Sequence, residues 1–165
     1  MAGTLPELNS DDGVEARELL AECRGPAYAD YTFEAAAECM RLMDAVLWNR
    51  MDTPRPFLAP NAHSLADIVT ARGQFAGLGN YPTLPPDIRQ RIADILAIAN
   101  NPKDARNGAY SQFVQQAMDT AKSTAFDDPS PGRLVAWRTA KHGSPGRGLL
   151  LYKTLLGNDF FYTDA

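Results

Sequence analysis

The sequence is poor in the residues that build metal and redox sites. Its 165 residues include two cysteines, Cys23 and Cys39, and two histidines, His63 and His142. Their spacing matches no CxxC or Cys/His metal motif, so we expect no metal site and no cofactor. The cysteines leave three interpretations open: two buried thiols, a disulfide that joins two helices, or a nucleophilic role.

Long apolar runs and an excess of positive charge are also missing. No segment approaches the roughly 20 apolar residues that cross a bilayer, so we expect no membrane span. The formal net charge is −4, and an acidic chain is a poor candidate for a non-specific nucleic-acid binder. Basic residues concentrate only between positions 133 and 153. They form either a solvated face or a surface that attracts an anionic polymer.

The pattern that is present predicts one mainly helical domain. Hydrophobic residues make up 45% and charged residues 22% of the chain, which is ordinary for a soluble globular protein. We expect residues 1–13 to form a flexible N-terminus and residues 14–165 to form a single domain. Ser10 and Ser64 are helix-start signals, Pro86 suits a first helical position, and one helical face is predicted by the spacing of Ala36, Met40, Met43, Leu47 and Met51. With the breakers between them, these signals predict helices over about 10–23, 32–51, 64–71, 86–100 and 110–122.

The C-terminal part has a different pattern. Short apolar and aromatic runs at about 134–137, 149–156 and 160–162 predict strands. Gly157-Asn158 lies between the last two and predicts their turn. The expected fold class is therefore α+β, mainly α, with a small C-terminal β element.

Carboxylates are the catalytic groups that remain, because no P-loop, dinucleotide-binding, GxSxG or HExxH motif is present. Glycosidic cleavage needs a protonated carboxyl group beside the leaving oxygen, and burial keeps such a group protonated near neutral pH. Glu22 lies at the C-terminal end of the first predicted helix, where the helix dipole favours the protonated form. The Gly25-Pro26 bend that follows opens space for a substrate. By itself, a glutamate in this position is more often a solvated surface residue.

A series of short motifs strengthens the case for Glu22. Glu22-Cys23-Arg24-Gly25 resembles the E-x-R-G motif of the cell-wall hydrolase family that includes the spore-cortex-lytic enzymes. Further segments resemble motifs of that family in the same order: the apolar helix ending in Asn-Arg (44–51), the short helix 64–69, the Gln-Phe motif 73–75, the Asp-Pro turn 127–133 and the closing strand 157–162.

The resemblance spans about residues 14–162 and implies a lysozyme-like fold. It also implies muramidase or lytic transglycosylase activity on peptidoglycan glycan strands, with one essential glutamate that corresponds to Glu22. Gln74 is then expected to bind an acetamido group, and Phe75 to pack on a sugar face or in the core. Tyr81 and Tyr162 are further candidates for the substrate groove.

Several departures from the family pattern, among them Ser130-Pro131 in place of Thr-x and an unusual loop over 26–32, concern the fine structure of the substrate more than the reaction class. Pro26 stands where the family usually has another acidic residue, and Asp159 replaces a histidine.

The expected mechanism uses Glu22 first as an acid and then as a base. It would protonate the oxygen between N-acetylmuramic acid and N-acetylglucosamine, then activate the sugar's own 6-hydroxyl or a water. A retaining mechanism needs a second carboxylate about 5 Å away, and its candidates are Glu34, Glu38, Asp44 and Asp52. The single glutamate of the family favours the transglycosylase route.

Two other functions fit the sequence. One is a Cys/His peptidoglycan amidase, with Cys23 as nucleophile and His63 or His142 as base. Against it, Cys23 follows the C-terminal end of a helix, whereas such nucleophiles usually lie at a helix N-terminus. The other is a peptidoglycan-binding module without catalysis.

The N-terminus bears on delivery. Residues 1–12 lack the charged and apolar regions of a secretory signal peptide. An enzyme that acts in the periplasm or cell wall would then need a specialised secretion system, phage lysis or a leader outside this sequence. A toxin delivered to a rival cell would imply a cognate immunity protein that blocks the groove.

Overall fold

The computed structural model describes residues 4–52, 63–71, 78–123 and 127–164. The helices are α1 (Asp11–Glu22), α2 (Phe33–Asp52), α3 (Leu65–Val69), α4 (Pro86–Ala99) and α5 (Asn107–Lys122). The strands are β1 (Arg133–Thr139), β2 (Leu150–Leu155) and β3 (Asn158–Thr163). The expected α+β class, mainly α with a small C-terminal sheet, is confirmed.

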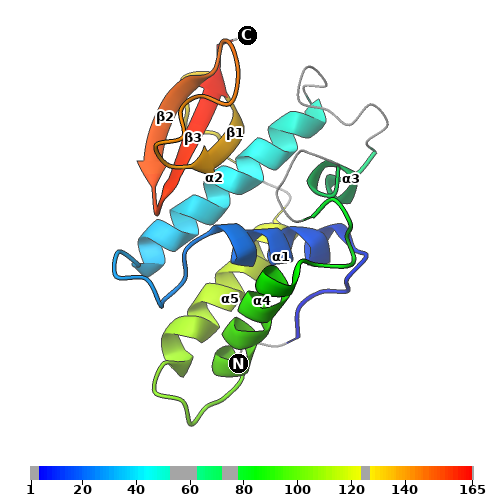
Figure 1. Ribbon diagram of the computed structural model, residues 1–165, viewed down its shortest axis with the longest axis vertical. Helices are drawn as coiled ribbons and strands as arrows, with labels where there is room; N and C mark the ends of the chain where they lie inside the picture. Colours follow the sequence, from blue (N-terminus) through cyan, green and yellow to red (C-terminus); the bar gives the residue numbers. More distant parts are fainter. Residues whose placement is uncertain (1–3, 53–62, 72–77, 124–126, 165) are drawn as a thin grey trace.

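Helix α2 is the central element. It packs against β1 on one side and against α5 on the other, so it lies between the sheet and the group formed by α1, α4 and α5 (Figure 1). Its predicted inner face is confirmed for Ala36, Met40, Met43 and Leu47, which are each at most 1% exposed. Met51, the last residue of that predicted face, is only partly buried. Cys39 and Val46 are buried as well, so α2 is covered on more than one face.

Local capping explains where several helices begin. The Ser10 side chain accepts a hydrogen bond from the backbone N–H of Gly13, 3.0 Å away, and caps α1. Ser64 caps α3 in the same way by accepting from the N–H of Asp67. Pro86 occupies the first helical position of α4, where its missing N–H costs no helical bond.

The segment before α1 packs on the domain over its described part. Leu5 belongs to the core with 7% exposure, and Arg17 on α1 donates to the carbonyl of Pro6 at 3.0 Å. The first three residues of the expected flexible N-terminus lie outside the described residues.

The sheet is antiparallel with the order β1-β3-β2, so the last strand of the chain lies in its middle. The hairpin between β2 and β3 corrects one prediction. Its turn residues are Leu156 and Gly157, with φ of 45° and 76°, and Asn158 already belongs to β3. A two-residue turn of this kind needs positive φ at both positions. Gly157 takes the second position, and the buried Leu156 takes the first.

Candidate active site around Glu22

Glu22 is the last residue of α1. The helix stops there because Cys23 is extended, with φ −83° and ψ 134°, and Gly25-Pro26 turns the chain away. Gly25 is buried against the ring of Phe113, and a Cβ at this position would lie 3.1 Å from that ring. The sequence after Glu22 is therefore held close to α5, and the Glu22 side chain is left at an edge of the core.

A pocket of about 160 Å³ opens at Glu22. Asn158, at the start of β3, donates through Nδ2 to the backbone carbonyl of Glu22 at 3.3 Å and fixes the hairpin against the end of α1. The pocket thus joins four parts of the chain: the end of α1 with its following loop, α4, the end of β1 and the β2–β3 hairpin. Its lining residues are Ala21, Glu22, Arg24, Tyr28, Arg91, Thr139, Leu156, Gly157 and Asn158.

The surroundings of Glu22 raise its pKa. Burial is the main cause, while a hydrogen bond from Trp137 and the positive charge of Arg91 act in the opposite direction. Burial therefore favours the protonated form that a general acid requires. The indole and the guanidinium stabilise the carboxylate that remains after the proton is given up.

Cationic and aromatic groups form the other walls. The Arg24 guanidinium lies 5.0 Å from the centre of the Tyr28 ring and pairs with Asp30 at 2.8 Å. Arg91 donates to the carbonyls of Leu20 and Cys23 at 3.1 and 2.8 Å, which satisfies the C-terminal end of α1. Both arginines are thus held in place beside Glu22.

Arg91 also lines a larger pocket beside this one. It lines a second pocket of about 560 Å³ between α4 and α5, which Ala27, Asp94, Ile95, Arg106 and Tyr110 also line. The Glu22 pocket alone is smaller than the roughly 300–1,000 Å³ of typical ligand sites. Arg91 is a wall that the two pockets share.

The sequence alone did not point to two further glutamates on α1. Glu15 and Glu18 precede Glu22 by seven and four residues, so all three lie on one face of the helix. Glu18 has no exposed surface, and neither of its carboxyl oxygens has a hydrogen-bond partner among the described residues. Burial and the charge of Glu22 raise its pKa, against the opposing charge of Arg50. The spacing of the glutamates was visible in the sequence, but it is equally typical of a solvated face.

Glu15 is paired with a carboxyl group of α2. Burial, with a hydrogen bond to Asp44 and the negative charge of Asp44, raises the pKa of Glu15 to about 11. The Glu15 carboxyl group therefore keeps its proton and donates it in a hydrogen bond that the Asp44 carboxylate accepts. Glu15, Glu18 and Glu22 thus follow one face of α1, with Asp44 of α2 beside Glu15.

The other predicted substrate-binding residues are not brought to Glu22. Gln74 and Phe75 lie outside the described residues. Tyr81 donates through its hydroxyl to the carbonyl of Leu8 and packs beside α3. Tyr162 is half-buried on β3, where it pairs with Leu134 and Leu150 in the sheet register. Neither tyrosine is among the residues that line the Glu22 pocket.

The candidates for a second catalytic carboxylate are also placed elsewhere. Glu34 is exposed, Glu38 pairs with Lys153 at 2.6 Å, and Asp44 faces Glu15. The side chain of Asp52 lies outside the described part of the chain. Within that part, Glu22 is the only acidic residue that lines its pocket.

The two cysteines are free and buried, so the disulfide interpretation is wrong. Cys23 has no exposed surface, its Sγ lies 3.5 Å from the Sδ of Met43, and burial raises the pKa of its thiol well above the ordinary value. A nucleophilic cysteine needs an accessible thiolate. The Cys23 sulfur is not accessible, and its raised pKa disfavours the thiolate form. Both properties disfavour the amidase alternative.

Two further observations concern metals and membranes. No three Cys, His, Asp or Glu side chains of the described residues are grouped so that they could hold a metal ion. None of the helices in the described ranges is long and apolar enough to cross a membrane.

Comparisons with protein families, curated proteins and solved structures give no match for this chain. The resemblance to the cell-wall hydrolases therefore stays a prediction from motifs, and function is inferred from the site itself.

Proposed function

We propose that this protein cleaves the glycan strands of peptidoglycan between N-acetylmuramic acid and N-acetylglucosamine, with Glu22 as the catalytic acid. The observation that carries the proposal is the position of Glu22: it ends a core helix, lines an open pocket and has a pKa raised by burial. This is the environment that keeps a carboxyl group protonated for transfer to a leaving oxygen. The order of the family-like motifs along the chain supports the same reaction.

The first step is proton transfer. The carboxyl group of Glu22 gives its proton to the glycosidic oxygen while the bond from that oxygen to the anomeric carbon breaks. Glu22 then carries a negative charge, which the Trp137 hydrogen bond and the Arg91 charge stabilise. This carboxylate in turn stabilises the positive charge that develops on the sugar.

In the second step Glu22 acts as a base. Because no other acidic residue of the described chain lines the pocket, a covalent glycosyl-enzyme route has no nucleophile there. We therefore favour attack by the sugar's own 6-hydroxyl. Its proton returns to Glu22 as the oxygen bonds to the anomeric carbon, and a 1,6-anhydro product leaves. Glu18, the nearest acidic neighbour on α1, is fully buried and has no access to a sugar.

The test is digestion of purified peptidoglycan followed by mass spectrometry. The wild type should release disaccharide peptides that are lighter than the hydrolysis products by one water molecule. Glu22→Gln keeps the shape of the side chain but removes its proton, and should lower turnover by about a thousandfold or more. Glu34→Gln makes the same change at an exposed position on α2. It is the matched control and should remain fully active.

Each other outcome points to a different function. Products without the anhydro form, still dependent on Glu22, would indicate a muramidase that uses water. Binding of peptidoglycan without any product would indicate a binding module. Full activity of Glu22→Gln would refute the assignment, and peptide release that Cys23→Ala abolishes would point to the amidase.

A further inference from the structure

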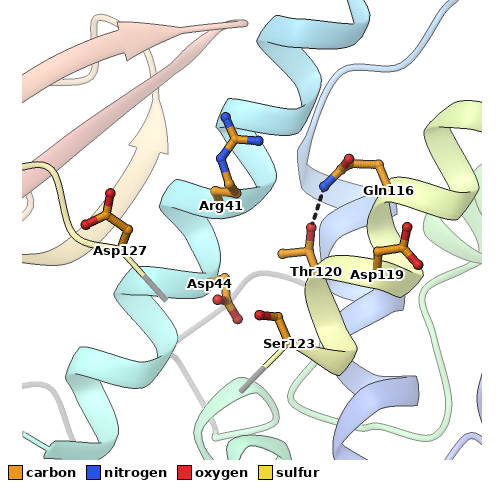
Figure 2. A pocket seen from close by; sticks show the side chains of 7 residues that line it. All are labelled: Arg41, Asp44, Gln116, Asp119, Thr120, Ser123 and Asp127. Atoms are coloured by element: carbon orange, nitrogen blue, oxygen red, sulfur yellow. Dashed lines mark hydrogen bonds between the residues drawn. The ribbon is translucent and has the colours of Figure 1, made fainter. Parts of the chain in front are cut away.

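Positive charge is concentrated in one continuous segment of the chain. Between positions 129 and 158 the sequence has five basic residues and no acidic one. The other 11 basic residues share the rest of the chain with all 20 acidic residues, which gives that part a net charge of −9. The hollow between α2 and the end of α5 shows this mixture, with Arg41, Asp119 and Asp127 in its lining (Figure 2). The excess of positive charge is therefore confined to β1, β2 and the loop between them.

The connection between β1 and β2 must cross a face of the sheet. Both strands are antiparallel to β3, which lies between them, so they are parallel to each other. Residues 140–149 therefore run from one end of the sheet to the other. Lys153 pairs with Glu38 of α2 at 2.6 Å and so identifies the inner face, which α2 covers. Phe160 is the register partner of Lys153, so Asp159, next to it on β3, points to the outer face.

Two contacts place the loop on this outer face. Asp159 accepts a hydrogen bond from the backbone N–H of Lys141 at 3.1 Å. Arg138, the register partner of Asp159 on β1, donates to the carbonyl of Gly143 at 3.4 Å. Residues 141–148 are all exposed, and a Cβ at Gly143 would meet no atom within 4 Å. The loop thus stands out from the sheet into the solvent.

The cations of the outer face are not neutralised at its surface. Arg138, Lys141 and Arg147 take part in none of the ion pairs that the described residues form. Asp159 is the one acidic residue between positions 129 and 163, and it is buried beneath the loop at 8% exposure. Salt screens charges that lie more than about 8 Å apart, so the loop attracts anions although the whole chain is acidic. A second copy of this chain is disfavoured as a partner, because it would bring like charges together.

Exposed leucines beside these cations narrow the choice of anionic partner. Leu150 and Leu151 begin β2 directly after the loop and are 44% and 55% exposed, the two highest values among the large hydrophobic residues of the described chain. Leu151 pairs with Phe161, two residues from Asp159 on β3, and so lies on the outer face. A soluble polyanion would gain from the cations alone. A bilayer with anionic lipids offers phosphate groups to the cations and an apolar boundary to the leucines.

We propose that the loop 140–149 and the start of β2 dock this protein on a membrane surface that contains anionic lipids. Lys141 and Arg147 meet the lipid phosphates, and Leu151 enters the boundary between headgroups and acyl chains. The docking does not depend on the proposed cleavage at Glu22, because none of these three residues lines the Glu22 pocket.

The experiment is co-sedimentation of the full chain with extruded vesicles. One set is pure phosphatidylcholine, and the other contains phosphatidylcholine and phosphatidylglycerol in equal amounts. The protein should bind the mixed vesicles and leave the neutral ones unbound, and added salt should weaken the binding. Beads that carry dextran sulfate provide a polyanion without an apolar region.

Two variants, each with a matched control, test the docking residues. Arg147→Gln removes one cation of the loop and should weaken binding to mixed vesicles about fivefold. Arg89→Gln makes the same change at an exposed position of α4 and should bind as the wild type does. Leu151→Thr keeps a residue type that favours strands and should also weaken binding about fivefold. Leu8→Thr, at an exposed leucine before α1, should leave it unchanged.

The proposal is overturned if the chain binds neutral and mixed vesicles equally well, or binds neither. Retention on dextran sulfate beads together with vesicle binding that Leu151→Thr leaves unchanged would identify a soluble polyanion as the partner instead. A stable dimer that Leu151→Thr dissociates would identify a second copy of the chain. All four substituted positions are exposed, and circular dichroism checks that each variant is folded.

Discussion

Glu22 owes its chemistry to the residues around it. A carboxyl group at a helix end is ordinary, but here burial raises its pKa while Trp137 and Arg91 hold that rise in check. The balance suits a group that must give up a proton and take it back within one reaction. Residues from β1 and α4 thus tune a side chain that belongs to α1.

The Trp137 contact makes a pH-dependent prediction that rests on the proposed function. Trp137→Phe removes a donor that stabilises the charged form of Glu22, so the pKa of Glu22 should rise further. Because the acid must be protonated, the alkaline limb of the kcat/KM profile should move upward by up to about one pH unit. An alkaline limb that stays in place or moves downward would contradict the role of this contact.

Glu15 makes a prediction about stability. Its pKa is about 11 in the folded protein against 4.5 ordinarily. Below pH 4.5 both states are protonated, and the free energy of unfolding is unaffected. Between pH 4.5 and 11 the unfolded chain loses this proton and the folded chain keeps it. Stability therefore falls as the pH rises, by at most about 1.4 kcal/mol per pH unit for one proton.

Glu15→Gln removes this source of pH dependence. A glutamine amide still donates to Asp44, so the variant should be at least as stable as the wild type at mildly alkaline pH, with a flatter decline. Urea unfolding at a series of pH values measures the slope, and Glu34→Gln serves as the exposed control. Equal slopes in the wild type and Glu15→Gln would show that Glu15 holds no such proton.

At the scale of elements, the site depends on how the β2–β3 hairpin meets the end of α1. Asn158 ties the hairpin to the Glu22 carbonyl, and the turn residue Gly157 lies against Arg24. A Cβ on Gly157 would lie 2.5 Å from Nη2 of Arg24. Because Gly157 has no side chain, the Arg24 guanidinium can lie against the hairpin turn and form a wall of the pocket.

Gly157→Ala tests this contact, with Gly148→Ala as its matched control. Both glycines have positive φ, 76° and 74°, so both variants should lose about 1 kcal/mol of stability. Only Gly157→Ala pushes the Arg24 guanidinium out of place, because a Cβ at Gly148 meets no atom within 4 Å. The expected result is reduced turnover for Gly157→Ala alone, measured on peptidoglycan beside thermal unfolding. Equal activity of the two variants would remove Arg24 from the site.

At the scale of the whole molecule, the core closes around both thiols. Cys23 and Cys39 lie in the main hydrophobic cluster with Leu19, Met40 and Met43, and neither is exposed. Their chemical reactivity is therefore coupled to unfolding of the entire domain.

This coupling can be measured with a thiol reagent. The native protein should react slowly with Ellman's reagent, and the protein unfolded in guanidinium chloride should show two thiols. Reaction should follow the same denaturant midpoint as loss of circular dichroism. Fast reaction of Cys23 in the native protein would reopen the amidase alternative. If the protein, unfolded without a reducing agent, showed no reactive thiols, the two cysteines would not be free.

Local sequence determined most of the secondary structure. The spacing of Met40, Met43 and Leu47 predicted α2, Ser10 and Ser64 predicted two helix starts, and Pro86 predicted the start of α4. These signals succeed because capping and helical periodicity act between residues a few positions apart. The hairpin turn was placed one residue too far along. The position of the turn depends on which side chain is buried in the core, and Leu156 is the buried one.

The sequence by itself determined that Glu22 ends a helix, and that the chain is a mainly helical α+β domain. Tertiary structure alone decided that Glu22 is buried enough for a raised pKa, that Glu15 and Glu18 lie inside, and that Asp44 lies beside Glu15. The physical reason is that burial and electrostatic surroundings come from segments distant in the chain. Arg91, Trp137 and Asn158 reach Glu22 only after α4 and the sheet have packed against α1 and α2.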